Sequence, residues 1–387
     1  MKNKFCPITV SLKKLALYSV LFLALAGCSQ NASKKATDKT ESDIKDELTT
    51  IMQRYSAVGL SVAAVENGKI IYNQSLGYKD LDKKIPLDNN DIMRIASISK
   101  SFTTVGILQL VEQGKLSLDS DVSQIMGFQI RNHNYPHIPI TVGMLLSHIS
   151  SMSDSNGYFT FNNLNRDSSQ TWQKVWNNYE PGSRYQYCNL GYNTLGAILE
   201  KVSGERFDKY IENHILKPLG VYGSHNVSAL DSTRFIKLYQ YNGTDKSFTL
   251  SSSAYDPQKE ALENYKPGYS TPIFSPTGGM KISAADLAKV MIMHMNYGTI
   301  DGIKILDSSS CAMMQSQITP TNYKNEYYGM GIITTDNLLK GHTLTGHDGL
   351  ALGAYTAMYW DKNKKQGFVV MTNGCDGKTE YDFANIL

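Results

Sequence analysis

Residues 92–114 read IMRIASISKSFTTVGILQLVEQG, and the interpretation of the whole chain starts from this stretch. Apolar residues recur in it at helical spacing and Gly114 follows as a stop signal, so we expect a helix over residues 98–113. Ser97 opens that helix after an apolar approach. Lys100 stands three residues later, and residues three apart share one face of a helix. The two side chains are therefore expected to point into the same site.

A serine beside a lysine has chemical meaning when both are held in one site. Serine is a poor nucleophile at neutral pH and needs a neighbouring base. Lysine is such a base only when burial or nearby charge lowers its pKa. A helix N-terminus also favours negative charge on the oxygen of Ser97, although a plain helix cap is the structural alternative for this residue. The same spacing recurs in a segment expected to be a signal and in an exposed helix, at Ser11 with Lys14 and Ser42 with Lys45.

A second motif, Tyr187-Cys188-Asn189, precedes a helix expected over residues 191–203. A tyrosine near a lysine can have a lowered pKa and act as a phenolate base. An asparagine can hydrogen-bond a substrate amide or hold the lysine. The alternative is a half-buried aromatic residue without a catalytic role. A rival copy, Tyr323-Lys324-Asn325, lies in a polar stretch that indicates a surface loop.

The third motif is Gly346-His347-Asp348-Gly349, just before a strand expected over residues 351–360. A histidine at a strand edge can donate a hydrogen bond or carry charge near pH 7. Glycine lets a backbone approach a ligand closely, so that strand N–H groups can bind an oxyanion. The alternative is a glycine-rich strand entry with a solvated histidine. The other histidines have no metal-ligand spacing, so we expect no metal and no cofactor.

The remaining pattern places strands at both chain ends. Apolar residues at helical spacing predict a helix near residues 44–55, and Asn67-Gly68 between two strand-like runs predicts a β-hairpin. Further signals predict a helix over 284–296, strands over 351–360 and 367–373, and a short terminal helix. We therefore predict an α+β fold with one antiparallel sheet, flanked by helices. Its α/β part is expected at about 41–96 and 341–387, and a mainly helical domain is inserted at about 97–340.

The first residues are expected to lie outside this fold. Four lysines precede an apolar run over residues 15–27, which is too short to span a membrane as a helix. Such a pattern is typical of an export signal. The run ends in Leu25-Ala26-Gly27-Cys28, which resembles the lipobox of bacterial lipoproteins. That resemblance implies a signal over 1–27, a lipid on Cys28 that holds the protein to a membrane of the bacterial cell envelope, and a flexible tether over 28–40. A plain secretory signal is the alternative.

Composition excludes some other classes of protein. The 387 residues are 41% hydrophobic and 19% charged, as in ordinary globular proteins. Removal of four signal lysines would change the formal net charge from +3 to about −1, so no nucleic-acid partner is expected. Cys6 would leave with the signal. The widely spaced Cys188, Cys311 and Cys375 do not form a disulfide framework.

Ser-x-x-Lys, Tyr-x-Asn and His-x-Gly occur here in the order found in the serine β-lactamase and penicillin-binding superfamily, which the chain resembles over roughly residues 41–375. Four further stretches are similar to the branch that contains class C β-lactamases, D-alanyl-D-alanine carboxypeptidases and β-lactamase-like esterases: ITVGMLLSHISSM (140–152), YEPGSRYQYCNLGYNTLGAILEKVSG (179–204), LKPLGV (216–221) and SPTGGMKISAADLAKV (275–290).

This resemblance implies catalytic roles for the matched residues. Ser97 would attack an acyl carbonyl and form an acyl-enzyme, and Lys100 and Tyr187 would share the acid and base work. Asn189 would position the substrate amide and the lysine. The backbone N–H groups of Ser97 and of Leu350 would form the oxyanion hole.

His347 and Gly349 would stand at a third motif where many members of the superfamily have Lys-Thr-Gly. A histidine carries charge only part of the time near neutral pH, and Asp348 adds a negative charge. Both features argue against a dedicated penicillinase and suit peptidases of the His-Thr-Gly kind and esterases. The expected substrate is a small-molecule or peptide acyl donor with an ester, amide or lactam bond. Acyl transfer to a hydroxyl or amine acceptor, a penicillin-binding sensor without turnover, and the oligomeric state remain open.

Overall fold

The structure is a computed structural model, and it describes residues 40–376. The expected signal over 1–27, Cys28, all of the tether except Thr40, and the expected terminal helix lie outside the described residues. Thr40 is the N-cap of the first described helix. Its hydroxyl accepts from the amide of Asp43, and the Asp43 carboxylate accepts from the amide of Thr40. Among residues 40–376, no helix is both long and apolar enough to cross a membrane.

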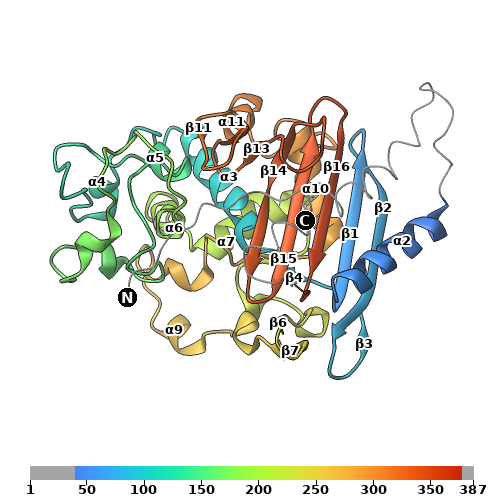
Figure 1. Ribbon diagram of the computed structural model, residues 1–387. Coiled ribbons are helices and arrows are strands. Elements are labelled where there is room, and N and C mark those ends of the chain that lie inside the picture. The colour runs from blue at the N-terminus through green and yellow to red at the C-terminus, as the bar shows by residue number, and fades with distance from the viewer. Residues whose placement is uncertain (1–39, 377–387) are drawn as a thin grey trace.

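A nine-stranded antiparallel sheet forms one side of the molecule (Figure 1), in the order β11-β12-β13-β14-β15-β16-β1-β2-β3. Its strands come from both ends of the described chain, as the sequence predicts. Their bounds are β1 Gly59–Glu66, β2 Lys69–Asp80, β3 Ile85–Pro86, β11 Thr319–Pro320, β12 Glu326–Tyr328, β13 Ile333–Thr335, β14 Leu344–Ala351, β15 Ala354–Asp361 and β16 Gln366–Thr372.

The predicted hairpin joins β1 to β2, and both of its turn residues have positive φ, 50° at Asn67 and 76° at Gly68. The N-terminal and C-terminal strands meet where β1 pairs with β16, so that Val62 lies opposite Val370. This pairing joins the N-terminal hairpin to the C-terminal strands. The predicted α+β fold is confirmed.

Alternating residues of the central strands pack into two separate hydrophobic cores. Leu60 and Val62 pack with Leu48 of helix α2 (Glu41–Arg54) on one face, while Ala63 and Val65 pack on the other face against α10 (Ala284–Met295). In Figure 1, α2 crosses in front of β1 and β2, and α10 lies behind the sheet. The sheet is therefore covered on both faces, so β1 and β16 are buried along almost their whole length, and alternate side chains lie in the two cores.

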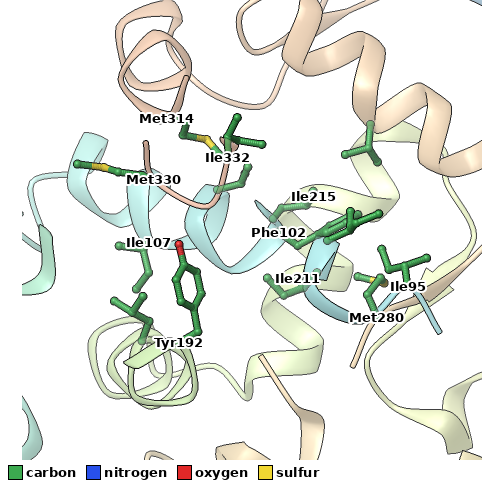
Figure 2. Packing of buried hydrophobic residues seen from close by; sticks show 14 of the residues in the cluster. Ile95, Phe102, Ile107, Tyr192, Ile211, Ile215, Met280, Met314, Met330 and Ile332 are labelled. Atoms are coloured by element: carbon green, nitrogen blue, oxygen red, sulfur yellow. The ribbon is translucent and has the colours of Figure 1, made fainter. Parts of the chain in front are cut away.

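The larger core continues into a helical region beside the sheet. Its helices are α3 Ser99–Glu112, α4 Val122–Met126, α5 Val142–Leu146, α6 Asn189–Ser203, α7 Phe207–Ile211, α8 Lys217–Leu219, α9 Lys259–Glu263 and α11 Ser308–Met314. Helix α3 is buried on nearly all sides, because Phe102 packs near Ile211 and Ile215, and Ile107 lies beside Tyr192 of α6 (Figure 2). Short pairings complete the structure: β4 Met93–Arg94 and β5 Gly223–Ser224 flank β8 Lys281–Ile282, β6 Tyr239–Asn242 pairs with β7 Ser247–Leu250, and β9 Thr299–Ile300 pairs with β10 Ile303–Lys304.

Two details of the prediction need correction. The sheet includes β11, β12 and β13, which fall inside the segment expected to be a helical insert up to residue 340. The strand expected over 351–360 is interrupted, because Leu352 and Gly353 both take positive φ and form the turn between β14 and β15. Gly353 has no room for a side chain, since a Cβ there would lie 2.1 Å from the carbonyl oxygen of Tyr239.

Candidate active site

Ser97 lies in a short 3-10 turn, Ala96–Ile98, that leads directly into α3. The residue before it, Ala96, has a φ of 46°, a left-handed conformation that costs of order 1–3 kcal/mol for a non-glycine residue. Neighbouring segments hold this turn. The amide of Ile95 donates to the carbonyl oxygen of Met280 at 3.0 Å, and the Thr356 hydroxyl donates to the Ile95 carbonyl oxygen at 2.9 Å. The backbone around Ser97 is thus fixed from both the helical side and the sheet.

Lys100 is fully buried one helical turn after Ser97, as the spacing predicts. Its Nζ donates to Ser97 Oγ at 3.2 Å, to Asn189 Oδ1 at 2.9 Å and to the carbonyl oxygen of Thr277 at 2.8 Å. Burial lowers the pKa of Lys100 from 10.5 to about 7, although the negative charge of Asp154 acts in the opposite direction. A substantial fraction of this amine is therefore uncharged at neutral pH, as a base requires.

Tyr187 is also buried in this site, and its hydroxyl hydrogen-bonds with Ser97. The Lys100 Nζ lies 4.7 Å from the centroid of the Tyr187 ring. Burial nevertheless raises the pKa of Tyr187 well above 10, and the hydrogen bond with Ser97 offsets only part of that effect. This direction disfavours the phenolate base that the sequence suggested, because loss of solvent is the largest effect on the pKa of Tyr187. Burial thus favours the neutral phenol at this position.

Asn189 is oriented by a residue that the sequence analysis did not single out. Its Nδ2 donates to Asp154 Oδ2 at 2.9 Å, which leaves Oδ1 to accept from Lys100 and from the hydroxyl of Thr277. Asp154 also accepts from the backbone amides of Asn189 and Leu190, both at 3.0 Å. Asp154 thus caps the N-terminus of α6, and a carboxylate at a helix N-terminus is stabilising.

His347 lies in the middle of β14 rather than at a strand entry, and it is only 2% exposed. Its Nδ1 lies 2.6 Å from the carbonyl oxygen of Asp348, which can only accept, so Nδ1 carries the proton. Its Nε2 then accepts from the Tyr328 hydroxyl at 3.3 Å. Burial lowers the pKa of His347 to about 4. The expected partial charge near pH 7 is therefore wrong: the ring is neutral, and Asp348 is exposed to solvent.

Gly349 brings β14 against the turn that carries Ser97. A Cβ at this position would lie 2.3 Å from the carbonyl oxygen of Ile95 and 3.0 Å from the amide nitrogen of Ser97. The backbones of Gly349 and Ser97 can approach this closely only because residue 349 has no side chain. Leu350 follows on the same strand with a partly exposed side chain. The geometry thus brings together the two backbone segments from which the oxyanion-hole donors are expected.

Two aromatic residues of the site were also missed. His148 was not singled out from the sequence; it is buried with its ring centroid 4.4 Å from that of Tyr187, and its Nδ1 accepts from the amide of Cys188 at 3.2 Å. Tyr328 lies on β12 in contact with both His148 and His347. The stretch 140–152 contains His148 and carried part of the resemblance, but a single sequence does not reveal which of its residues reach the site. The rival Tyr323-Lys324-Asn325 is an exposed loop, as predicted.

A serine, a buried lysine and a tyrosine that meet where an antiparallel sheet joins a helical region define the class of β-lactamase-like serine hydrolases. The chain belongs to the beta-lactamase family, whose sequence model matches residues 44–387. This assignment confirms the resemblance carried by the three motifs.

Two curated relatives and one solved structure show how far the similarity extends. Protein flp of Staphylococcus aureus strain MRSA252 is 31% identical over 189 residues, 48% of this chain and 38% of that protein. Penicillin-binding protein 4* of Bacillus subtilis is 32% identical over 169 residues, 42% of this chain and 36% of that protein. The matched segments thus span well under half of these relatives. The octameric penicillin-binding protein homologue from Pyrococcus abyssi superposes with a TM-score of 0.70 at 25% identity, over 87% of this chain and 74% of that chain.

Proposed function

We propose that this protein is a serine hydrolase that forms an acyl-enzyme on Ser97 and cleaves an ester or amide bond. The observation that carries the proposal is the position of Lys100, a buried amine 3.2 Å from Ser97 Oγ with a pKa lowered to about 7. General-base catalysis is most efficient when the pKa of the base lies near the working pH. A solvated lysine would be protonated and would leave the serine unreactive.

The proposed acylation begins when the free amine of Lys100 takes the hydroxyl proton as Ser97 Oγ attacks the acyl carbonyl. Backbone N–H groups of Ser97 and Leu350 then stabilise the oxyanion, and one such donor is typically worth about 10²–10³ in rate. The neutral phenol of Tyr187 donates its proton to the leaving group and is reprotonated by the Lys100 ammonium. Water attacks the acyl-enzyme in the second half, with the same groups acting in reverse.

The state of His347 bears on the substrate. In the superfamily the lysine of Lys-Thr-Gly supports binding of the drug carboxylate, but here a neutral, buried histidine takes that place. This position offers no full positive charge to a lactam carboxylate at neutral pH. We therefore propose that esters or amides, rather than penicillins and cephalosporins, are turned over efficiently.

Substitution of Ser97 by alanine tests the proposal. Wild-type protein is expected to become labelled with one equivalent of a fluorophosphonate, and Ser97→Ala is expected to lose all labelling. Ser101→Ala is the matched control, because the Ser101 hydroxyl is buried one turn further along α3 and donates only to the Ile98 carbonyl oxygen, at 2.7 Å. Intact-mass spectrometry reads the adduct. Stoichiometric labelling of Ser97→Ala would refute the assignment, and a single burst on an ester without turnover would indicate a sensor.

A further inference from the structure

A cavity of about 440 Å³ adjoins the candidate active site, a volume within the range of small-molecule pockets. Leu350, Ala351 and Leu352 at the end of β14 form part of its wall. Ser275 and Gly279 line it as well, from the segment whose Thr277 carbonyl oxygen accepts from Lys100. The cavity therefore begins where the proposed oxyanion hole ends, and a substrate acylating Ser97 can extend into it.

Two cationic residues, Arg94 and Lys281, line this cavity side by side. They are direct partners in the register between β4 and β8. Like charges directly opposite one another on neighbouring strands repel and are destabilising. Lys281 is only 4% exposed and Arg94 is largely buried, so water screens this repulsion poorly. Burial and the charge of Arg94 both lower the pKa of Lys281 well below 10.5, so an anion bound beside this amine would favour its protonated form.

Within the described residues, the hydrogen-bond acceptors of these two basic side chains are neutral. The Arg94 Nε donates to the Gly278 carbonyl oxygen at 2.8 Å, and the Lys281 Nζ donates to the His225 carbonyl oxygen at 2.9 Å. Within residues 40–376 neither cation forms a salt bridge with an acidic residue. Asp256 is the only acid among the described residues that line the cavity, and it is exposed to solvent.

Unused donors point to what the cavity accepts. An arginine has five N–H donors and a lysine ammonium has three, so both residues can donate further hydrogen bonds. Buried charges in proteins are normally paired, because an unpaired buried charge is costly. An arginine next to a lysine in a partly closed cavity is well suited to a planar carboxylate, which can accept from both side chains at once.

We propose that the Arg94–Lys281 cavity binds a carboxylate at the far end of the acyl substrate, so that the preferred substrates are anionic acyl donors. The inference rests on the proposed function, since it concerns the substrate of the same serine. Arg94 also stands three residues before Ser97, so the carboxylate is held on the structure that carries the nucleophile. The competing interpretation is that the two cations only brace the backbone carbonyls of residues 225 and 278.

A matched pair of esters separates these interpretations. The probes are 4-nitrophenyl hexanoate and mono-4-nitrophenyl adipate, which have the same chain length and differ in a terminal carboxylate. Wild-type protein is expected to prefer the adipate by kcat/KM, after correction for spontaneous hydrolysis. Lys281→Met should lower the adipate-to-hexanoate ratio by at least about tenfold, equivalent to about 1.4 kcal/mol. Arg94→Gln should act in the same direction, and Lys281→Arg should retain the preference.

Lys362→Met is the matched control. Lys362 is a partly buried lysine that donates to the Gln315 carbonyl oxygen at 3.2 Å and does not line the cavity, so its loss should leave the ratio unchanged. The subsite is overturned if wild-type protein shows no preference for the adipate, or if the ratio survives in both Lys281→Met and Arg94→Gln. Failure of the proposed function gives a different result, in which neither ester is turned over and Ser97 is not labelled. That result would reject the proposed subsite as well.

Discussion

At the scale of single residues, protonation states decide the chemistry proposed here. Lys100 and Tyr187 are both buried, and burial favours the neutral form of each. For the lysine this yields a free amine, which is a base. For the tyrosine it yields a phenol, which is an acid. One physical cause therefore divides the acid and base roles that the sequence analysis assigned to the pair jointly.

The spacing of the motifs predicted which residues meet but not how they are held. Ser97 and Lys100 are one helical turn apart, so their convergence follows from local geometry. Asp154 and Thr277 reach the site only because distant segments fold against α3 and α6, and no local pattern announces them. The charge of His347 could not be predicted from the sequence either, because it depends on the burial of this residue against Tyr328.

Asp154 provides a test at this scale. Asp154→Ala should remove the cap of α6 and disturb the amide of Asn189, so we expect kcat/KM to fall by about 10-fold to 100-fold, with about 0.5–2 kcal/mol lost in the free energy of unfolding. Asp121→Ala is the control, since Asp121 caps α4 by accepting from the amide of Ser123 at 2.9 Å and also pairs with Arg131. It should lose stability without loss of activity. Equal kinetic losses in the two variants would contradict a positioning role for Asp154.

At the scale of elements, strand β14 is the part of the structure that joins sheet and nucleophile. The sequence predicted the strand-forming tendency of this region but placed the strand start after Gly349. Glycines in the interior of a strand usually weaken it and mark a close backbone approach. Gly349 has this function here, because it allows β14 to reach the turn of Ser97.

Gly349→Ala should therefore push β14 away from Ser97. A displacement of about 1 Å in a catalytic geometry can cost about 100-fold in rate, and we expect a loss of that size in the fluorophosphonate labelling rate. Gly191→Ala is the control, because a Cβ there would meet Leu145 only at an ordinary 3.6 Å. Stopped-flow labelling of both variants measures the effect. Labelling of Gly349→Ala at the wild-type rate would show that this approach is not needed.

At the scale of the whole molecule, the sheet unites segments more than 250 residues apart in the chain, such as β1 and β16. The Asn67-Gly68 turn and the apolar strands at each end were sufficient to predict one sheet built from both ends of the chain. The short strands β11 to β13 escaped detection, because two or three residues carry too little periodicity to distinguish a strand from a loop. Their place in the sheet follows from tertiary packing around Tyr328.

We propose that the whole protein is exported and held to the bacterial envelope by a lipid on Cys28, a residue outside the described part of the structure. The supporting pattern is the apolar run followed by Leu25-Ala26-Gly27-Cys28. Growth with an alkyne-labelled fatty acid should label the wild-type protein, and Cys28→Ser should abolish labelling and release the protein from membranes. Cys188→Ser is the control, because that thiol is buried in the fold. Membrane retention of unlabelled Cys28→Ser would contradict the anchor.

The central claim, that the free amine of Lys100 activates Ser97, is tested most directly by the pH dependence of labelling with a fluorophosphonate. Because the amine acts only when deprotonated, the rate should rise with pH and reach a plateau above a midpoint of about 7. His347, with a pKa lowered to about 4, cannot produce this rise. Lys100→Arg stays protonated, so it should lack the rise and react at least about 100-fold more slowly. Two results would contradict the account. The first is a wild-type rate that stays flat from about pH 6 to about pH 8.5, the range that brackets this midpoint. The second is a rise that persists in Lys100→Arg.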